Sequence, residues 1–351
     1  MKIQGIPSPG DGLRLHLNEN TGGCSPRVIE AIRTLTPTDI AAYPDYKKAV
    51  LTCAEYFQVN PEELLLTNGL DEGILMVALA NFGRAYDPEQ EAIVPVPAFD
   101  PYLTATAAVG AKVIRVPPGP NFAFPVDEVI TAISPKTRLI FLNTPNNPTG
   151  QIIPHQIIRR VIDAAPQATV LVDEAYVEFA NGSFLDELSQ HSNVVLGRTF
   201  SKAYGMAGMR IGCLIAKPGT IDPIRKVIPI FNMNVVAITA MQAAVKDQSF
   251  LPAYTAEVKE SRQRLYEACR RLDLEYWESS ANFVLVRVGK LAPKVVAALD
   301  TRGIHVRDRS QDPYSPGCIR ITAGVLSHTD EAIKALEANV SSGLIETRGA
   351  L

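Results

Sequence analysis

Seven short apolar runs, separated by stretches of helical character, constrain the fold of this 351-residue chain more than any other feature. Such runs, when they alternate with helices, are typical of a mostly parallel sheet with helices on both faces. We therefore predict an α/β fold whose large domain holds a mostly parallel seven-stranded sheet covered by helices. The runs are Leu64–Thr67, Ala92–Val96, Lys112–Val116, Leu139–Leu142, Thr169–Val172, Val194–Leu196 and Ile211–Ile215.

The pattern changes after about residue 240. Residues 257–271 have the character of a long charged helix, and residues 282–288, 304–307 and 318–322 are predicted to form strands. Because the chain is too long for one small core, we predict a second, smaller α+β domain. The predicted boundaries give an N-terminal segment, 1–42, that packs with the small domain, a large domain, 43–240, and a small C-terminal domain, 241–351.

Composition excludes several classes of partner. The net charge of -3 offers no basic field for nucleic acid or for an anionic membrane. The sequence has no apolar run of membrane-spanning length and no signal-peptide pattern near Met1, so we expect a cytoplasmic protein. Five scattered cysteines and five histidines show no metal-ligand spacing, and we expect no metal.

Polar clusters follow several of the apolar runs directly. Asn68-Gly69 comes after the first run, residues 143–150 follow another, and Asp173 and residues 199–202 follow two more. Ligand sites in mostly parallel sheets lie beyond the carboxyl ends of the strands. Four clusters at such ends therefore predict one ligand site along one edge of the sheet.

Lys202 is the residue on which the predicted chemistry depends. A lone lysine in a loop is usually a solvated surface charge, whereas a reactive lysine needs a pKa lowered by burial or by neighbouring cations. Arg198 and Arg210 are the candidate cations, and Thr199, Ser201 and Arg210 together suit a phosphate group. We therefore ask whether Lys202 holds an aldehyde cofactor as a Schiff base.

Asp173 and Tyr176 fit such a cofactor. At a strand end an aspartate is often only a helix N-cap, and a tyrosine three residues later is often part of the core. A buried carboxylate also pairs with a pyridinium nitrogen and keeps it protonated. The Tyr176 hydroxyl would bond the ring's phenolic oxygen. An amide from the 146–150 segment would bond the same oxygen, although the composition of this segment is that of an ordinary turn.

Three further positions have both a structural and a functional interpretation. Gly69–Asp71 begins a helix after a strand, which is either a plain helix start or an anion site built from free N–H groups. Phe99, between Pro97 and Pro101, is either a core residue or a platform that stacks on a ring. Arg320 forms a surface ion pair or clamps a substrate carboxylate or phosphate.

With these residues the chain resembles the pyridoxal-phosphate-dependent aminotransferases of the aspartate aminotransferase fold, and within them it is most similar to the histidinol-phosphate aminotransferases. The resemblance covers nearly the whole chain. Its ordered motifs are Leu17-Asn18-Glu19-Asn20, Tyr43-Pro44-Asp45, Gly69-Leu70-Asp71-Glu72, Asn146-Asn147-Pro148-Thr149-Gly150, Asp173-Glu174-Ala175-Tyr176, Ser201-Lys202 with Arg210, and Arg320-Ile321-Thr322.

The resemblance implies a role for each candidate residue. Lys202 carries the cofactor, pyridoxal 5'-phosphate, and shuttles a proton, while Asp173 and Tyr176 complete the catalytic set at the pyridine nitrogen and the phenolic oxygen. Asn147 also bonds the phenolic oxygen, and Phe99 stacks on the ring. The remaining implied cofactor-binding residues surround the phosphate or, in the case of Tyr43, come from the neighbouring subunit of an expected homodimer: Gly69, Leu70, Asp71, Thr199, Ser201, Arg210 and Tyr43.

The implied reaction is transamination between a small-molecule amino donor and a 2-oxo acid. The implied pair is L-histidinol phosphate and 2-oxoglutarate, in histidine biosynthesis, with Arg320 and Asn20 binding substrate. After residue 20, however, the family continues with proline or a similar residue and then an aromatic, where this chain has Thr21-Gly22-Gly23-Cys24. An aromatic or broad-range amino-acid aminotransferase is therefore the alternative, followed by a threonine-phosphate decarboxylase and a non-catalytic cofactor-binding regulator.

Overall fold

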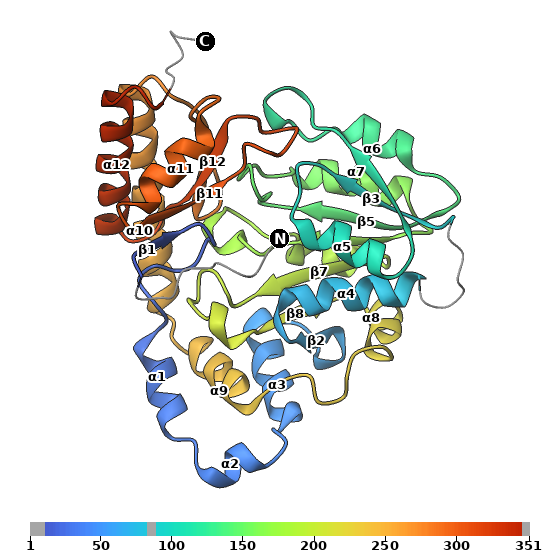
Figure 1. Ribbon diagram of the computed structural model, residues 1–351. Coiled ribbons are helices and arrows are strands. Elements are labelled where there is room, and N and C mark those ends of the chain that lie inside the picture. Colours follow the sequence, from blue (N-terminus) through green and yellow to red (C-terminus); the bar gives the residue numbers. More distant parts are fainter. Residues whose placement is uncertain (1–10, 83–88, 346–351) are drawn as a thin grey trace.

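Two sheets organise the computed structural model, which describes residues 11–82 and 89–345 (Figure 1). The large sheet has seven strands in the order β2-β8-β7-β6-β5-β3-β4, which confirms the predicted fold class. Its strands are β2 (Leu64–Thr67), β3 (Glu91–Pro95), β4 (Lys112–Val116), β5 (Thr137–Asn143), β6 (Thr169–Asp173), β7 (Val194–Thr199) and β8 (Gly212–Ile215).

One strand of the large sheet runs against the others. β8 pairs antiparallel with both β2 and β7, whereas β3, β4, β5, β6 and β7 pair in parallel. β2 and β7 therefore run in the same direction, although β8 lies between them. As a result, the carboxyl ends of six strands and the amino end of β8 lie along one edge of the sheet.

Both faces of the large sheet are buried, which explains why its strands are continuous apolar runs. Along β5, Leu139 and Phe141 pack on one side, and Ile140 and Leu142 on the other. The first face is covered by α4 (Gly69–Phe82), α5 (Asp100–Ala108) and α8 (Pro218–Arg225). The second is covered by α3 (Tyr46–Phe57), α6 (Val126–Ala132) and α7 (His155–Ala164).

The small sheet has five strands in the order β1-β11-β12-β10-β9. Helix α10 begins at Phe250, seven residues before the predicted start. Pro252 does not prevent this start, since it lies in the first turn, where proline is tolerated. The strands are β1 (Leu13–Leu15), β9 (Glu275–Trp277), β10 (Phe283–Arg287), β11 (Ile304–Asp308) and β12 (Cys318–Thr322), and the helices are α10 (Phe250–Arg271), α11 (Ala292–Asp300) and α12 (Leu326–Ser341).

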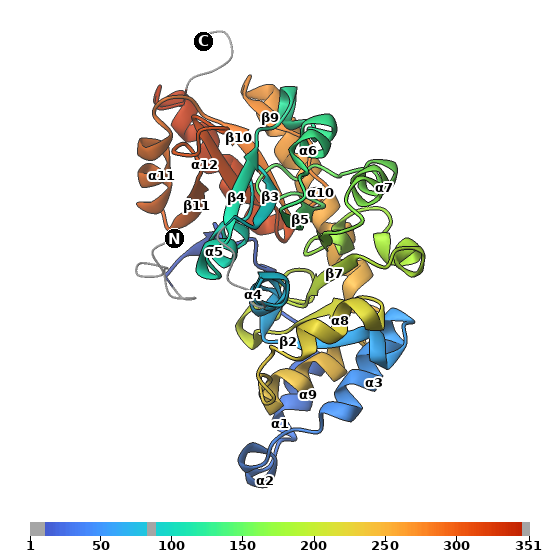
Figure 2. The ribbon, with the colours of Figure 1, turned by 90° about the vertical axis from the view of Figure 1, so that its right-hand side faces the viewer.

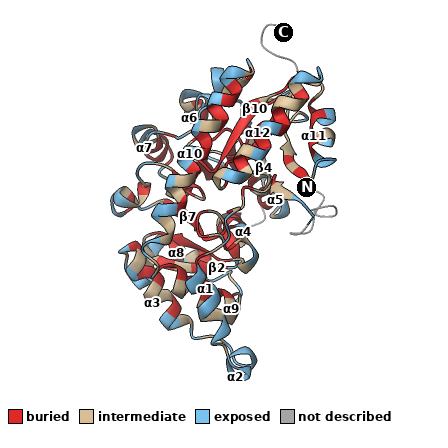
Figure 3. Ribbon diagram, turned by 90° about the vertical axis from the view of Figure 1, so that its left-hand side faces the viewer, coloured by how far each residue is buried: buried red, intermediate tan, exposed pale blue. Residues whose placement is uncertain are grey.

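The N-terminal segment contacts two parts of the molecule. β1 pairs in parallel with β11 and forms an edge of the small sheet, whereas α1 (Pro26–Arg33) packs against α9 (Val235–Ala244). The short helix α2 (Pro37–Ala41), which has no buried residue, projects beside α9, away from α11 and α12 (Figures 2 and 3). The predicted domain boundaries stay a prediction, and residues 1–10 of the N-terminal segment lie outside the described residues.

The described residues, 11–82 and 89–345, contain neither a membrane-spanning helix nor a metal-binding group of side chains. No helix there is long and apolar enough to cross a membrane. In the same ranges, no group of three or more histidine, cysteine or acidic side chains is arranged to hold a metal ion.

Candidate active site

The predicted strand-end residues meet along the edge of the large sheet where the parallel strands finish. Gly69 follows β2, Asn147 follows β5, Asp173 ends β6, and Lys202 lies three residues after β7. Arg210 precedes β8, and the antiparallel direction of β8 places its amino end at the same edge. Residues spread over more than 140 positions of the chain, from Gly69 to Arg210, therefore contribute to one site.

Lys202 is half-buried at the centre of this site. Its Nζ donates a hydrogen bond to the carbonyl oxygen of Leu17 at 2.9 Å and lies 5.9 Å from the centroid of the Tyr176 ring. Burial, and then the nearby Arg320 guanidinium, lower the pKa of Lys202 to about 8. A substantial neutral fraction near neutral pH makes this amine a nucleophile.

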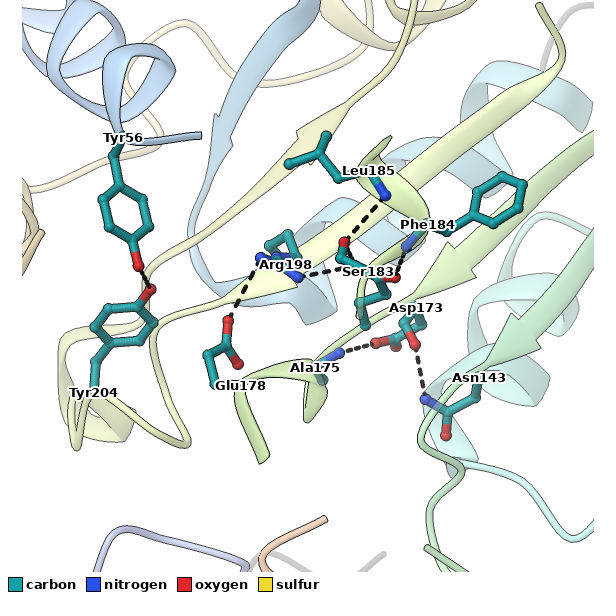
Figure 4. Close-up of polar contacts among 11 residues, drawn as sticks. Tyr56, Asn143, Asp173, Ala175, Glu178, Ser183, Phe184, Leu185, Arg198 and Tyr204 are labelled. Carbon is teal, nitrogen blue, oxygen red and sulfur yellow. Dashed lines mark hydrogen bonds and ion pairs between the residues drawn. The ribbon is translucent and has the colours of Figure 1, made fainter. Parts of the chain in front are cut away.

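Asp173 is buried and its carboxylate receives two hydrogen bonds, of which Figure 4 shows the one from Ala175. The Tyr102 hydroxyl donates to one carboxylate oxygen at 2.6 Å, and the Ala175 N–H donates to the other at 2.9 Å. Burial raises the pKa of Asp173 to about 6, although both hydrogen bonds oppose the rise. A cationic ring nitrogen beside it would favour the ionised carboxylate, as opposite charges do.

Tyr176 is buried within reach of both Lys202 and the N-terminal segment. Its hydroxyl oxygen accepts a hydrogen bond from Nδ2 of Asn18 at 3.0 Å. Its ring packs edge-on against Phe283, with 5.1 Å between the ring centroids. Burial raises the pKa of Tyr176, so the phenol keeps its proton and is a hydrogen-bond donor at neutral pH.

A cradle for an anion forms where α4 begins. Gly69 has φ +74°, and a Cβ built on it would lie 2.4 Å from Nη2 of Arg210. Arg210 also pairs with Asp71 at 2.9 Å, and the Thr199 hydroxyl donates to Ser201 Oγ at 3.0 Å. A guanidinium, two hydroxyls and a helix N-terminus therefore converge on one place, which suits a phosphate group.

Arg320 connects the small sheet to the opposite side of the site. It is buried, and its Nη1 donates to Oδ1 of Asn147 while Nη2 donates to the carbonyl of His16 at 2.7 Å. The Asn147 N–H in turn donates to Oδ1 of Asn143 at 2.7 Å. Burial lowers the pKa of Arg320 to about 10, which still leaves the guanidinium charged at neutral pH.

The segment that departs from the family pattern packs on the loop that carries Lys202. Asn20 donates from Nδ2 to the carbonyl of Ala203 at 3.0 Å. Thr21 Oγ1 accepts a hydrogen bond at 2.9 Å from the backbone N–H of Val325, the residue directly before α12. The segment therefore contacts both the Lys202 loop and the small domain.

Three predicted residues lie away from the centre or face it only in part. The Leu70 side chain is buried against the sheet, so the predicted phosphate contact falls to its backbone N–H. Phe99 packs edge-on against Tyr102, with 5.8 Å between the ring centroids. Tyr43 is 73% exposed and stacks on Phe231 at 3.8 Å, so within one chain it is not part of the site.

Arg198, predicted as a second cation beside Lys202, has a different role. Its Nη1 pairs with Glu174 at 2.9 Å, and its Nη2 lies 3.8 Å from Glu178 (Figure 4). Its guanidinium also stacks over Phe57 at 5.1 Å. The side chain points to the opposite side of β7 from Thr199, because alternate residues of a strand face opposite ways; Arg320 and Arg210 are the cations that lower the pKa of Lys202.

The site also contains residues to which the sequence patterns gave no individual role, although Asn143 belongs to the polar cluster at 143–150. Tyr102 lies on α5, three residues after Phe99, and this helical spacing was the available signal. Asn143 ends β5 and donates from Nδ2 to the carbonyl of Asp173 at 3.2 Å. Asn18 belongs to a motif that was noted, but its contact with Tyr176 spans 158 residues and has no local signature.

Comparisons with known proteins agree with this geometry. The family model for aminotransferase class I and II matches residues 10–336. A histidinol-phosphate aminotransferase 2 of Legionella pneumophila is 34% identical, over 93% of this chain and 89% of the relative. A histidinol-phosphate aminotransferase of Methanococcoides burtonii is 33% identical, over 93% and 90%.

A solved structure extends the comparison to three dimensions. The histidinol-phosphate aminotransferase of Sinorhizobium meliloti, in complex with pyridoxal-5'-phosphate, superposes with a TM-score of 0.85 at 27% identity, covering 94% of this chain and 91% of that one. The anion cradle, the buried carboxylate and the amine of lowered pKa fit the phosphate, the ring nitrogen and the aldehyde of that cofactor. The chain therefore belongs to the class I and II aminotransferases, which are pyridoxal-phosphate-dependent enzymes.

Proposed function

We propose that this aminotransferase moves the amino group of L-histidinol phosphate to 2-oxoglutarate, giving imidazole acetol phosphate and L-glutamate. Its curated relatives at 33–34% identity are histidinol-phosphate aminotransferases, and the matches extend over most of both chains. The observation that carries the chemistry is the placement of the Lys202 amine and the buried Asp173 carboxylate at one sheet edge beside the anion cradle.

In this proposal the residues of the chain hold the cofactor at four points. Asp173 pairs with the pyridine nitrogen, Tyr176 and Asn147 donate to the phenolic oxygen, and Phe99 covers the ring. The bound cofactor supplies an electron sink for the amino-bearing carbon. The phosphate is held by Thr199, Ser201, Arg210 and the backbone N–H groups of Gly69, Leu70 and Asp71.

Lys202 has two tasks in the proposed mechanism. Its neutral amine binds the aldehyde, which the lowered pKa favours. With substrate bound, Nζ of Lys202 would take the proton from the amino-bearing carbon of the substrate as a general base, and as the conjugate acid would return that proton to the aldehyde carbon of the cofactor. An amine whose pKa is near the working pH suits both directions of this transfer.

Substrate binding is assigned to the small-domain side of the site. Arg320 supplies a charged fork for a carboxylate or phosphate, and Asn20 lies beside Ala203 in the Lys202 loop. We further propose a homodimer in which Tyr43 of one subunit completes the site of the other, because its ring is exposed here. The cytoplasmic location stays a prediction.

A donor comparison tests the substrate. The cofactor-loaded protein is mixed with L-histidinol phosphate, L-phenylalanine or L-tyrosine, with 2-oxoglutarate as acceptor, and kcat/KM for glutamate formation is measured. We expect the phosphate ester to react at least about tenfold better, equivalent to about 1.4 kcal/mol in the transition state. Equal or faster turnover of the aromatic amino acids would favour the alternative function.

The alternative, an aromatic or broad-range amino-acid aminotransferase, is favoured by one specific observation. The Thr21-Gly22-Gly23 segment places no aromatic side chain where the family has one, although the Gly23 carbonyl lies against Gly205, three residues after Lys202. A threonine-phosphate decarboxylase is a lesser alternative, which release of carbon dioxide from O-phosphothreonine would support. A visible absorption band without transamination of any donor would support a regulator instead.

A further inference from the structure

The hydroxyl group of Tyr176 has one proton, and the direction of that proton decides what the residue does. In the described part of the chain, the Tyr176 oxygen accepts a hydrogen bond from Nδ2 of Asn18 at 3.0 Å, and no acceptor for its own proton is present. The ring is buried, so solvent does not freely supply an acceptor. The proton is therefore available to a group bound between Tyr176, Asp173 and Lys202.

Asn18 also contacts the small domain. The Thr322 hydroxyl donates to the Leu15 carbonyl oxygen at 2.9 Å, accepts the Asn18 backbone N–H at 3.1 Å, and lies 3.4 Å from Asn18 Oδ1. The Asn282 side chain donates to the Asn18 carbonyl oxygen at 3.0 Å. The Asn18 side chain lies with Oδ1 toward the Thr322 hydroxyl and with Nδ2 toward Tyr176.

The backbone of Asn18 is also specialised. Its φ is +54°, in the left-handed region, which asparagine tolerates better than most other residues. Asn18 is 1% exposed and Thr322 is fully buried. The Asn18 side chain is therefore enclosed between Tyr176 and the small domain.

We propose that Asn18 is a positioning residue: by donating to the Tyr176 oxygen, it leaves the Tyr176 proton free for the phenolic oxygen of the cofactor. This inference rests on the proposed function. If Asn18 presented an acceptor instead, Tyr176 would donate to it and turn away from the cofactor. The donated bond also polarises the phenol and strengthens the hydrogen bond that it gives.

The same contacts couple the substrate side of the site to the cofactor. Thr322 lies two residues after Arg320 on β12, so both side chains face the site from one strand. Arg320 contacts Asn147, and Thr322 contacts Asn18. Both proposed donors to the phenolic oxygen are thus tied to the strand that carries the substrate clamp.

The test is a double-mutant cycle on the cofactor-loaded protein, read as the pH midpoint of the cofactor's visible absorption band. The variants are Asn18→Gly, Tyr176→Phe and their combination. Glycine removes the amide and accepts the left-handed backbone. Because the ionised phenolic oxygen loses stabilisation, we expect each single change to raise the midpoint, Asn18→Gly by about half a pH unit or more.

The cycle separates positioning from a purely structural role. In the Tyr176→Phe background, we expect Asn18→Gly to add no further shift, because the proton that it positions is gone. The matched control is Asn121→Gly, an exposed asparagine with φ +53°, which should leave the midpoint unchanged. Additive shifts, or no shift in Asn18→Gly, would overturn the inference.

Two further measurements keep the test decisive. If Asn18→Gly does not fold, Asn18→Asp replaces it, because aspartate keeps the shape and the left-handed backbone but presents an acceptor. Asn18→Asp should then raise the midpoint more when residue 176 is tyrosine than when it is phenylalanine. Failure of the proposed function looks different, because it would appear in the donor comparison as no preference for L-histidinol phosphate, whereas the midpoints of the Asn18 and Tyr176 variants need only the bound cofactor.

Discussion

At the scale of single residues, Lys202 shows how position changes chemistry. The side chain is an ordinary ammonium by composition, yet burial and the Arg320 guanidinium lower its pKa to about 8. Between pH 8 and 10.5 the unfolded chain binds the Lys202 proton and the folded chain does not. The free energy of unfolding contributed by this group therefore rises with pH across that window.

A stability measurement checks this linkage. Without cofactor, the free energy of unfolding in urea is measured from pH 7 to 10 for the wild type, Lys202→Met and Lys47→Met. We expect Lys202→Met to remove part of the rise in the free energy of unfolding between pH 8 and 10, because methionine keeps the apolar part of the side chain and does not titrate. Lys47 is exposed, and its replacement should leave the slope intact. Parallel curves for all three proteins would contradict the lowered pKa.

Gly69 is a second residue whose role is local. Gly69→Ala brings a Cβ to 2.4 Å from the Arg210 guanidinium and forces alanine into φ +74°. Gly343 has the same φ of +74° with nothing within 4 Å, so Gly343→Ala carries the backbone strain alone. We expect both to lose about 1–2 kcal/mol of stability, and Gly69→Ala alone to weaken pyridoxal phosphate binding about tenfold or more. If Gly69→Ala and Gly343→Ala bound pyridoxal phosphate with equal affinity, the phosphate would not lie in the cradle at Gly69.

At the scale of secondary-structure elements, the runs of residues could be predicted but their directions could not. The strand Gly212–Ile215 reads like its parallel neighbours, and only its pairing with β2 and β7 makes it antiparallel. That direction brings Arg210 to the site. Residues at strand ends, such as Asp173, could be located because they follow a local pattern, whereas Asn18 reaches Tyr176 through tertiary packing that no local pattern encodes.

Helix α5 provides a prediction at this scale, because it carries Tyr102 to Asp173. Tyr102→Phe keeps the stacking on Phe141, at 4.7 Å between centroids, and removes the donated hydrogen bond. Since that bond lowers the Asp173 pKa, we expect the pKa to rise above about 6. In the proposed site, ionised Asp173 pairs with the ring nitrogen, so the affinity for pyridoxal phosphate should fall as the pH drops through about 6. In the variant the fall should begin at a higher pH. Titration of affinity against pH measures both midpoints.

At the scale of the whole molecule, the site lies between two sheets and is built from both. Lys202, Asp173 and Arg210 come from the large sheet, and Arg320 from the small one. The N-terminal segment joins them, since β1 belongs to the small sheet and Asn20 contacts the Lys202 loop. The seven-stranded sheet could be predicted from the apolar runs, but the contribution of the chain's first residues to both sides of the site depends on the assembled fold.

An exposed apolar surface near α2 and α9 leads to the last prediction. Ile40, Tyr43, Ile230 and Phe231 are each more than half exposed, and the two rings stack on each other. Water-exposed clusters of this kind mark protein–protein contacts, which agrees with the proposed homodimer. We expect light scattering to give twice the chain mass of 38.1 kDa.

A charged residue introduced into this surface should both separate the subunits and lower the activity. Ile230→Asp, at a residue 82% exposed, is expected to give monomers and to reduce kcat/KM at least about tenfold, because Tyr43 no longer reaches a neighbouring site. Ile152→Asp, at an exposed isoleucine between β5 and α7, is the control and should change neither mass nor activity. A fully active Ile230→Asp monomer would show that each chain completes its own site and that the Tyr43 assignment is wrong.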